Sequence, residues 1–285
     1  MQDTTKIHTL RSKKSRKRAL DFLTHSECKN FYLLEGVSSQ KFPPYLYGIY
    51  SDGKLRGIIY SRNGPHLHLH LDQIINTHLY ADIKKFLLSY FSSSFLLFGE
   101  EHIIAPFIHR NLFPPKKIRN YHFMRLDRHS YYRNINNILY SNARVTKKTL
   151  TVHDARPLSE LQAHYEAEEL HIDEQQLDHH KITIALVHRI KLDTLTALYD
   201  RNIPVAIASV NARFQDTCQI GSVFVLPEYR NQGIGTILLK THLEKLLHHY
   251  TTIVLFVDIH NHAAIHLYQK LGFYKNGRLM QVNVE

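Results

Sequence analysis

The sequence predicts an α/β protein that contains mixed sheets and is built as two halves. First, the chain has 285 residues, about twice the usual size of a single domain. Second, short runs of β-branched and aromatic residues alternate with longer amphipathic stretches along the whole chain. Third, a polar segment rich in Asn, Tyr and Arg, residues 127–147, separates two such series, so we expect domains at residues 1–145 and 146–285.

The composition indicates which kinds of partner and which compartment suit this protein. Lys and Arg number 36 against 25 Asp and Glu, and the net charge of +11 attracts polyanions such as nucleic acid or phosphate-rich cofactors. A basic soluble protein without such a partner is the simpler interpretation. The two cysteines, Cys28 and Cys218, are far apart, so we expect reduced thiols and no metal-binding pair. Because no long apolar run occurs, we also expect no signal peptide, no membrane span and a cytoplasmic location.

The first half begins with a basic segment and then alternates strands with helices. Residues 11–18 read RSKKSRKR, which suits an arm for nucleic acid or a membrane surface, or else the solvated face of a first helix. We favour the helix face. Residues 45–60 predict a hairpin around the Asp52-Gly53 turn. A helix and two strands are then expected, at residues 83–91, 95–98 and 121–126.

Three histidines alternate with leucines in the strand after this hairpin. His66, His68 and His70 share one side of the strand, where neighbouring side chains lie roughly 6–7 Å apart. Two such histidines can bind zinc, but a further ligand would have to come from elsewhere, and the sequence offers no Cys or Glu cluster for it. We therefore expect a polar sheet face and no metal.

The second half has the clearer pattern. Its expected elements, in order, are a strand at residues 149–152, a helix at 157–172, a helix at 181–190, a hairpin at 194–214, a strand at 218–225, a helix at 234–249, a buried strand at 253–257, a helix from Asn261, and a last strand pair at Phe273 and residues 280–284. The two halves share the order helix, hairpin, strand, helix, strand.

The helix predicted at residues 157–172 carries a carboxylate on its apolar side. Apolar residues fall on one face at helical spacing, namely Leu158, Leu161, Tyr165 and Ile172. Glu169 falls on the same face, whereas Glu166 and Glu168 lie at its margin or off it. A buried carboxylate is unfavourable unless it is paired or has a function. Glu169 is therefore either paired with an Arg or Lys, or acts as a base or as an anchor for a substrate amine.

A Gly-rich turn joins the strand at residues 218–225 to the next helix. Such a turn offers several backbone N–H groups to an anion, and Gly233 and Gly235 allow close approach of a phosphate. The Rossmann pattern G-x-G-x-x-G and the P-loop pattern ending in G-K-[ST] are both absent. The turn therefore predicts a phosphorylated ligand of another kind.

A second motif lies about 25 residues further on, and together the two resemble the GNAT superfamily of acyl-CoA N-acyltransferases. The turn matches the family's pyrophosphate pattern R/Q-x-x-G-x-G/A at Arg230, Gly233 and Gly235. Residues 261–273 match its pattern N-x-x-A-x-x-L-Y-x-K-x-G-F. The resemblance covers residues 148–285. The first half resembles the family only in its order of elements, as a degenerate GNAT-like half of a tandem protein would.

The resemblance implies how acetyl-CoA, as acyl donor, would bind. The turn would hold its pyrophosphate, and backbone groups of the preceding strand would hold the pantetheine arm and polarise the thioester carbonyl. Asn261 would bind the donor's arm, or else cap the following helix. The donor-binding residues implied are Val223, Phe224, Val225, Arg230, Asn231, Gln232, Gly233, Ile234, Gly235, Asn261 and Tyr268.

The resemblance also implies catalytic roles. Tyr268 occupies the position from which family members protonate the leaving thiolate, although it could instead only pack beneath the donor. Glu169 is our candidate for the base, with Glu168 second. The predicted function is an N-acetyltransferase in which a primary amine attacks the thioester directly. The acceptor is a small amine or a protein amine. The acidic residues between 166 and 174 suit a cationic acceptor, but a solvated helix face explains most of these charges equally well.

Two other functions are compatible with the sequence. A non-catalytic acyl-CoA sensor would keep the turn but would need neither an acid nor a base. A nucleic-acid-associated protein would explain the net charge and residues 11–18, but the chain lacks the interleaved basic and aromatic residues of a known module. We favour the enzyme, because Tyr268 and Glu169 supply a candidate acid and base.

Overall fold

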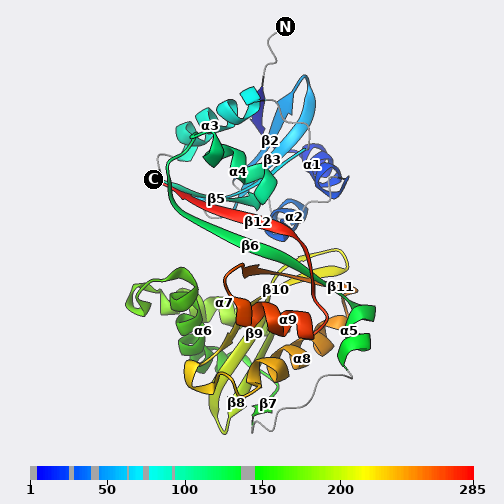
Figure 1. Cartoon of the computed structure of the whole chain (residues 1–285), viewed down its shortest axis with the longest axis vertical. Coiled ribbons are helices and arrows are strands. Elements are labelled where there is room, and N and C mark those ends of the chain that lie inside the picture. Colours follow the sequence, from blue (N-terminus) through cyan, green and yellow to red (C-terminus); the bar gives the residue numbers. More distant parts are fainter. Residues whose placement is uncertain are drawn as a thin grey trace. The chain divides into compact units, whose positions relative to one another are not determined.

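The computed structural model describes residues 5–25, 29–39, 45–62, 64–72, 77–91, 94–135 and 145–285. It divides into two compact units, both of mixed α/β type, so the predicted fold class is confirmed (Figure 1). The first unit comprises Met1–Phe123, Phe256–Asn261 and Lys275–Glu285, and the second comprises Met124–Leu255 and His262–Tyr274. The bounds of these units differ from the predicted domains at residues 1–145 and 146–285. The domain boundary at residue 145 stays a prediction.

The first unit begins with a short edge strand and two helices. Its elements are β1 (Lys6–Thr9), α1 (Lys13–His25), α2 (Phe31–Ser38), β2 (Tyr45–Ser51), β3 (Lys54–Ser61), β4 (His66–Leu71), α3 (Thr77–Phe91), β5 (Phe95–Glu100), α4 (Glu101–His109) and β6 (Pro115–Asp127), which enters the second unit at Met124. Neighbouring strands pair in the order β1-β2-β3-β4-β5, and only β4 and β5 are parallel.

The second unit repeats this arrangement. Its elements are α5 (Arg128–Ile135), β7 (Thr146–Lys147), α6 (Ala155–Leu170), α7 (His179–Lys191), β8 (Leu195–Asp200), β9 (Ile203–Phe214), β10 (Thr217–Val225), α8 (Ile234–Leu247), β11 (Thr252–Asp258) and α9 (His262–Lys270), followed by β12 (Tyr274–Val284). Strands pair in the order β7-β8-β9-β10-β11, and only β10 and β11 are parallel. The shared order of elements predicted for the two halves is therefore present.

The last strand of the chain pairs in the first unit. Residues 279–284 of β12 run antiparallel to β5, with Leu279 opposite Glu100 and Val284 opposite Phe95. The prediction of a separate strand pair at Phe273 and residues 280–284 was wrong, because β12 is one continuous strand. The end of β6 in turn lies against the start of β11 in the second unit, where the Arg128 N–H donates to the Thr251 carbonyl at 2.9 Å.

Three local predictions need correction or refinement. No strand forms at residues 149–152, where a 3₁₀ turn follows the short strand β7. Helix α6 ends at Leu170, because His171 adopts a left-handed conformation with φ of 56°, so Ile172 lies outside the helix and is exposed. Residues 11–18 overlap the start of α1 and are mostly exposed, which agrees with the helix-face interpretation.

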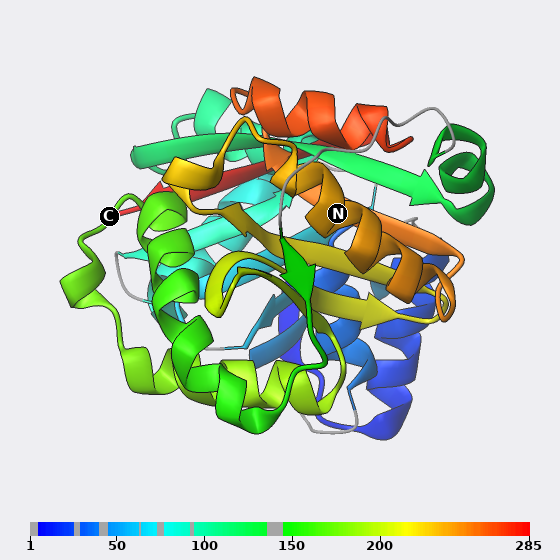
Figure 2. The same cartoon turned by 90° about the horizontal axis from the view of Figure 1, so that it is seen from below.

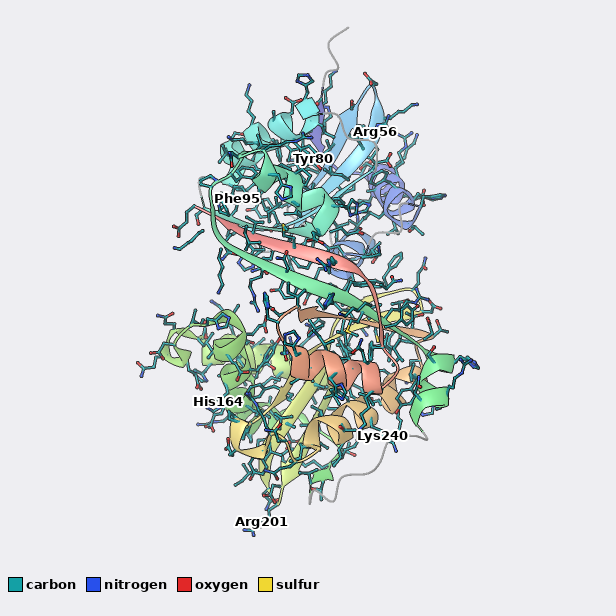
Figure 3. The ribbon with its side chains drawn as sticks, viewed as in Figure 1. Arg56, Tyr80, Phe95, His164, Arg201 and Lys240 are labelled. Atoms are coloured by element: carbon teal, nitrogen blue, oxygen red, sulfur yellow. The ribbon has the colours of Figure 1, made fainter. Side chains whose placement is uncertain are left out.

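The sheet of the second unit is covered on both faces. Alternate residues of β8 and β9 point to opposite sides, so Ala197 and Ile207 pack with α6 and α7, whereas Leu198 and Ala208 pack with α8. Figure 2 shows these helices on either side of the strands. In Figure 3 the labelled Arg201 marks the tip of the β8–β9 hairpin. Helix α8, which begins at the Gly-rich turn, therefore packs on a sheet that is covered by helices on both faces.

The histidines of β4 are in different environments. His66 is exposed, whereas His70 is buried with its Nδ1 3.4 Å from the Glu100 carboxylate. Within the described ranges, no group of three or more His, Cys, Asp or Glu side chains could hold a metal ion. No helix in the same ranges combines the length and the apolar character needed to cross a membrane.

Acidification is expected to destabilise the protein through His242. This side chain is fully buried on α8, and burial, followed by the Lys245 and Lys147 charges, lowers its pKa to about 3. Because the unfolded histidine titrates near 6.5, the contribution to stability is complete above pH 6.5 and is lost as the pH falls toward 3. Over that window, the free energy of unfolding should fall by about 1.4 kcal/mol per pH unit from this residue.

Urea unfolding at several pH values between 7 and 5 measures this effect. His242→Gln should flatten the pH dependence, whereas His248→Gln, at an exposed position after the same helix, should leave it unchanged. A slope that stays the same in the His242 variant would contradict the assignment.

Candidate functional site

Strand β10 separates from its parallel neighbour partway along its length. Within the described residues, β10 pairs with β11 from Thr217, opposite Thr252, to Gln219, opposite Val254, but β10 itself continues to Val225. Past Gln219, no pairing of β10 with β11 is recorded in the described part of the chain, and the binding of a ligand by Val223, Phe224 and Val225 stays a prediction.

A β-bulge interrupts β10 at the same place. The register against β9 shifts between Gly221 and Phe224, and Ser222 has a left-handed φ of 49°. A Cβ at Gly221 would lie 2.0 Å from the Asn211 Nδ2 atom, so a larger residue here would require the Asn211 side chain to move. Beyond the bulge, Phe224 packs against Tyr165 of α6, with ring centroids 6.1 Å apart. The bulge thus changes the direction of the β10 backbone near the point where its recorded pairing with β11 ends.

The turn after β10 has the geometry of an anion-binding loop. A 3₁₀ turn, Pro227–Tyr229, leads to Asn231 and Gly233, which have left-handed φ values of 62° and 78°. Gly233 is the N-cap of α8, and no side chain caps this end of the helix. The first N–H groups of a helix lack intrahelical acceptors, and together with the helix dipole they attract an anion. The turn therefore fits the diphosphate of a nucleotide-type ligand.

The two glycines of this turn have different functions. Gly233 supplies the left-handed conformation that begins α8. Gly235 lies inside α8, and a Cβ there would approach the Leu267 Cδ2 atom of α9 to 3.2 Å. This contact is tight, so Gly235 brings α8 and α9 close together, in addition to the role expected for it in binding phosphate.

Arg230 is already engaged by protein groups. Its Nε donates to the Val225 carbonyl at 3.0 Å, and its Nη2 lies 2.7 Å from the Glu168 carboxylate. The guanidinium also lies 5.3 Å from the centroid of the Phe224 ring. Glu168, the second candidate for a base, is thus an exposed residue on the outer side of α6 that pairs with the turn.

Tyr268 and Glu169 lie on two different helices of the second unit, α9 and α6. The Tyr268 side chain is buried on α9, with its ring centroid 5.7 Å from that of Phe273. Burial raises the pKa of the Tyr268 phenol, and the Glu169 charge raises it further. The phenol therefore stays protonated at neutral pH and can donate a proton. Glu169 is half-buried near the end of α6, as expected from its place on the apolar face.

Two further predicted site residues, Gln232 and Asn261, make hydrogen bonds within the protein. The Gln232 Nε2 donates to the Glu228 carbonyl at 2.9 Å, which stabilises the turn. Asn261 ends the segment Phe256–Asn261, which clusters with the first unit, and its backbone N–H donates to the Asp258 carbonyl at 3.0 Å. The role of its side chain stays a prediction, as do the ligand contacts of Asn231 and Ile234.

Two polar residues of α6 were missed in the sequence. Gln162 is buried, and its Nε2 donates to the Glu166 Oε1 at 2.9 Å. Glu166 is half-buried, although its sequence position had suggested the margin of the apolar face. The spacing of Gln162 and Glu166, which are four residues apart beside the predicted apolar face, was the available signal.

Comparison with known proteins supports the resemblance in the second half. Residues 156–273 match the sequence model described as the acetyltransferase (GNAT) family. A search of curated protein sequences finds no match.

Solved structures with the same fold extend over nearly the whole chain. A GNAT-family acetyltransferase from Colwellia psychrerythraea is 16% identical, with 98% of this chain and 100% of that chain covered and a TM-score of 0.57. A tandem GNAT protein from the clavulanic acid biosynthesis pathway is 15% identical, with 98% of each chain covered and a TM-score of 0.68. A GCN5-related N-acetyltransferase from Sphaerobacter thermophilus is 12% identical, with 98% and 95% covered and a TM-score of 0.66. The chain therefore has a tandem GNAT fold.

Proposed function

Because residues 156–273 match the acetyltransferase (GNAT) family, we propose that the second half of this chain is an acetyl-CoA-dependent N-acetyltransferase. The observation that carries the proposal is the helix N-terminus at Gly233, which no described side chain caps and which follows the end of β10 beyond its recorded pairing with β11, together with the buried phenol of Tyr268 on α9. A base and an acid on two different elements, α6 and α9, are what acyl transfer to an amine requires. The partners are acetyl-CoA and a small amine or protein amine, and we propose a cytoplasmic location.

The turn and the end of β10 would bind the donor. The N–H groups at the start of α8, between Gly233 and Gly235, would hold the diphosphate, with the Arg230 guanidinium beside them. The bulged backbone at Val223–Val225 would pair with the pantetheine arm, and one of its N–H groups would polarise the thioester carbonyl.

Glu169 and Tyr268 would move the protons of the reaction. Glu169 accepts a proton from the acceptor's ammonium group, so the neutral nitrogen can attack the thioester carbon. A C–N bond forms, the C–S bond breaks, and the electron pair leaves on sulfur. Tyr268 donates its phenolic proton to that thiolate. The excess proton on the attacking nitrogen restores the phenol through solvent, and Glu169 releases the proton that it accepted to bulk water.

The first test is an acetyl-transfer assay with the full chain. Free thiol should be released from acetyl-CoA only when a primary amine is present, and the acetylated amine should be detected by mass spectrometry. Acetyl-CoA binding without transfer to any small or protein amine would favour the non-catalytic sensor. RNA binding that survives high salt would instead favour the nucleic-acid function, because purely electrostatic binding weakens with salt.

Removal of the Glu168 charge is expected to tighten CoA binding. In the structure Arg230 pairs with Glu168, and a diphosphate would compete for the same guanidinium. Both side chains are substantially exposed, so Glu168→Gln should lower the Kd of CoA only about 2- to 5-fold at low salt. Calorimetry at low and high ionic strength measures this, and the difference should disappear at high salt. Glu160→Gln, on an exposed turn of the same helix, is the control. A weaker affinity in Glu168→Gln would mean that the ion pair instead preorganises the turn.

A further inference from the structure

The side of α6 that faces the sheet becomes polar toward the C-terminal end of the helix. Leu158 and Leu161 are buried near its start, but Gln162, Glu166 and Glu169 follow on the same side, within an arc of about 60°. Glu160, His164 and Glu168 lie on the opposite, exposed side; His164 is labelled in Figure 3. The inward-facing charges are therefore distinct from the solvated face of this helix.

Gln162 carries a buried acceptor atom that no described residue satisfies. Its side chain is 2% exposed, and its Nε2 donates to the Glu166 Oε1 at 2.9 Å. Its Oε1 has no hydrogen-bond partner among the described residues. Buried polar atoms are normally satisfied, so an exception beside a candidate site indicates a place for a ligand donor.

Glu166 is the charged group next to this acceptor. Its hydrogen bond comes from the neutral Gln162 amide, and the ion pairs recorded among the described residues do not include it. Glu169, whose charge acts on Tyr268, lies three residues on, a rise of about 4.5 Å along the helix. Tyr165 fixes this stretch of helix over Phe224 of β10, so both carboxylates belong to the region of the acyl-transfer site.

We propose that the acceptor of this site is a linear amine with a second cationic nitrogen, which binds Glu166 and the Gln162 Oε1 while the reacting amine lies at Glu169. This inference rests on the proposed function and specifies its substrate class. An ammonium or guanidinium group supplies both the charge that balances Glu166 and the N–H donor that Gln162 lacks. A monoamine of equal length could satisfy only Glu169.

Three matched amines test the proposal with the full chain: 1,4-diaminobutane, 1-aminobutane and 4-aminobutan-1-ol. The diamine should be acetylated with the highest kcat/KM, because only it places a charge at Glu166. Glu166→Gln keeps the shape and the contact with Gln162, and it should reduce kcat/KM for the diamine about 10- to 100-fold. Glu166→Gln should leave kcat/KM for the two monoamines within about twofold of the wild-type values. Glu160→Gln should not change kcat/KM for any of the three amines.

Binding measurements separate this inference from the proposed function. Calorimetry of 1,4-diaminobutane against the CoA-saturated protein should show binding to the wild type that weakens in Glu166→Gln, whether or not turnover is detected. Equal use or equal binding of diamine and monoamine by the wild type, or a loss in Glu166→Gln that affects all three amines alike, would overturn the assignment of substrate class. Failure of acetyl-CoA itself to bind would overturn the proposed function. The titration of the free protein with 1,4-diaminobutane would still decide whether Glu166 and Gln162 form a site for the second nitrogen.

Discussion

Gly233→Asp is expected to abolish acetyl-CoA binding. Gly233 caps α8 with a left-handed φ of 78°, a conformation that costs a residue with a side chain roughly 1–2 kcal/mol. An Asp at an N-cap also accepts hydrogen bonds from the first N–H groups of its own helix. The new carboxylate would thus occupy the anion site and repel the diphosphate. The Kd of CoA should rise at least about 100-fold.

Calorimetry with CoA measures this loss, and the chain offers a matched control. Gly53 has a similar φ of 72° at the tip of the β2–β3 turn, and a Cβ there would meet no atom within 4 Å. Gly53→Asp therefore introduces the same strain and the same charge in the first unit, and its CoA affinity should equal that of the wild type. A Gly233→Asp variant that is folded and binds CoA normally would refute the assignment of the turn as the diphosphate site.

Tyr268→Phe should reduce kcat about 10²- to 10⁴-fold, the range typical for loss of a general acid. The change removes only the hydroxyl group, so packing with Phe273 and the affinity for CoA should stay close to those of the wild type. The pKa of this phenol is raised by burial and by Glu169, so the proton stays on the donor at a pH above the usual tyrosine value of about 10. In the wild type, deprotonation of the Tyr268 phenol should therefore not reduce kcat at pH values up to about 10.

Steady-state kinetics and CoA titrations together distinguish catalysis from packing. Tyr274→Phe is the control, because Tyr274 is exposed and donates its hydroxyl hydrogen to Asp127 at 3.1 Å. It should leave kcat within about twofold. If Tyr268→Phe lowered CoA affinity as much as kcat, the residue would have a packing role and the proton donor would have to be another group.

The parts of the candidate site that the sequence predicted are those set by local chemistry. A left-handed glycine before a helix, a short apolar strand ahead of it and the Asn261–Phe273 pattern depend on residues close together in the chain. Glu169 was also found from helical periodicity, because its neighbours Leu158 and Leu161 define the buried face. The hairpins around Gly53 and Arg201 follow in the same way from turn residues between β-rich runs.

The parts that were missed depend on partners distant in the sequence. Glu168 proved to pair with Arg230, 62 positions away, and no spacing rule relates the two residues. The end of α6 shifted because His171 adopts a left-handed conformation that propensity alone does not specify.

For this protein, the sequence determined the fold class, the Gly-rich turn that begins α8 and the residue types of the proposed acid and base, because each depends on local conformation or on residue type. Tertiary structure alone decided that β12 pairs with β5, that the Glu169 charge acts on the Tyr268 phenol, and that the Gln162 Oε1 is buried without a partner in the described part of the chain. The physical reason is that strand pairing, electrostatic coupling and burial are relations between distant segments, and the chain must be folded before they exist.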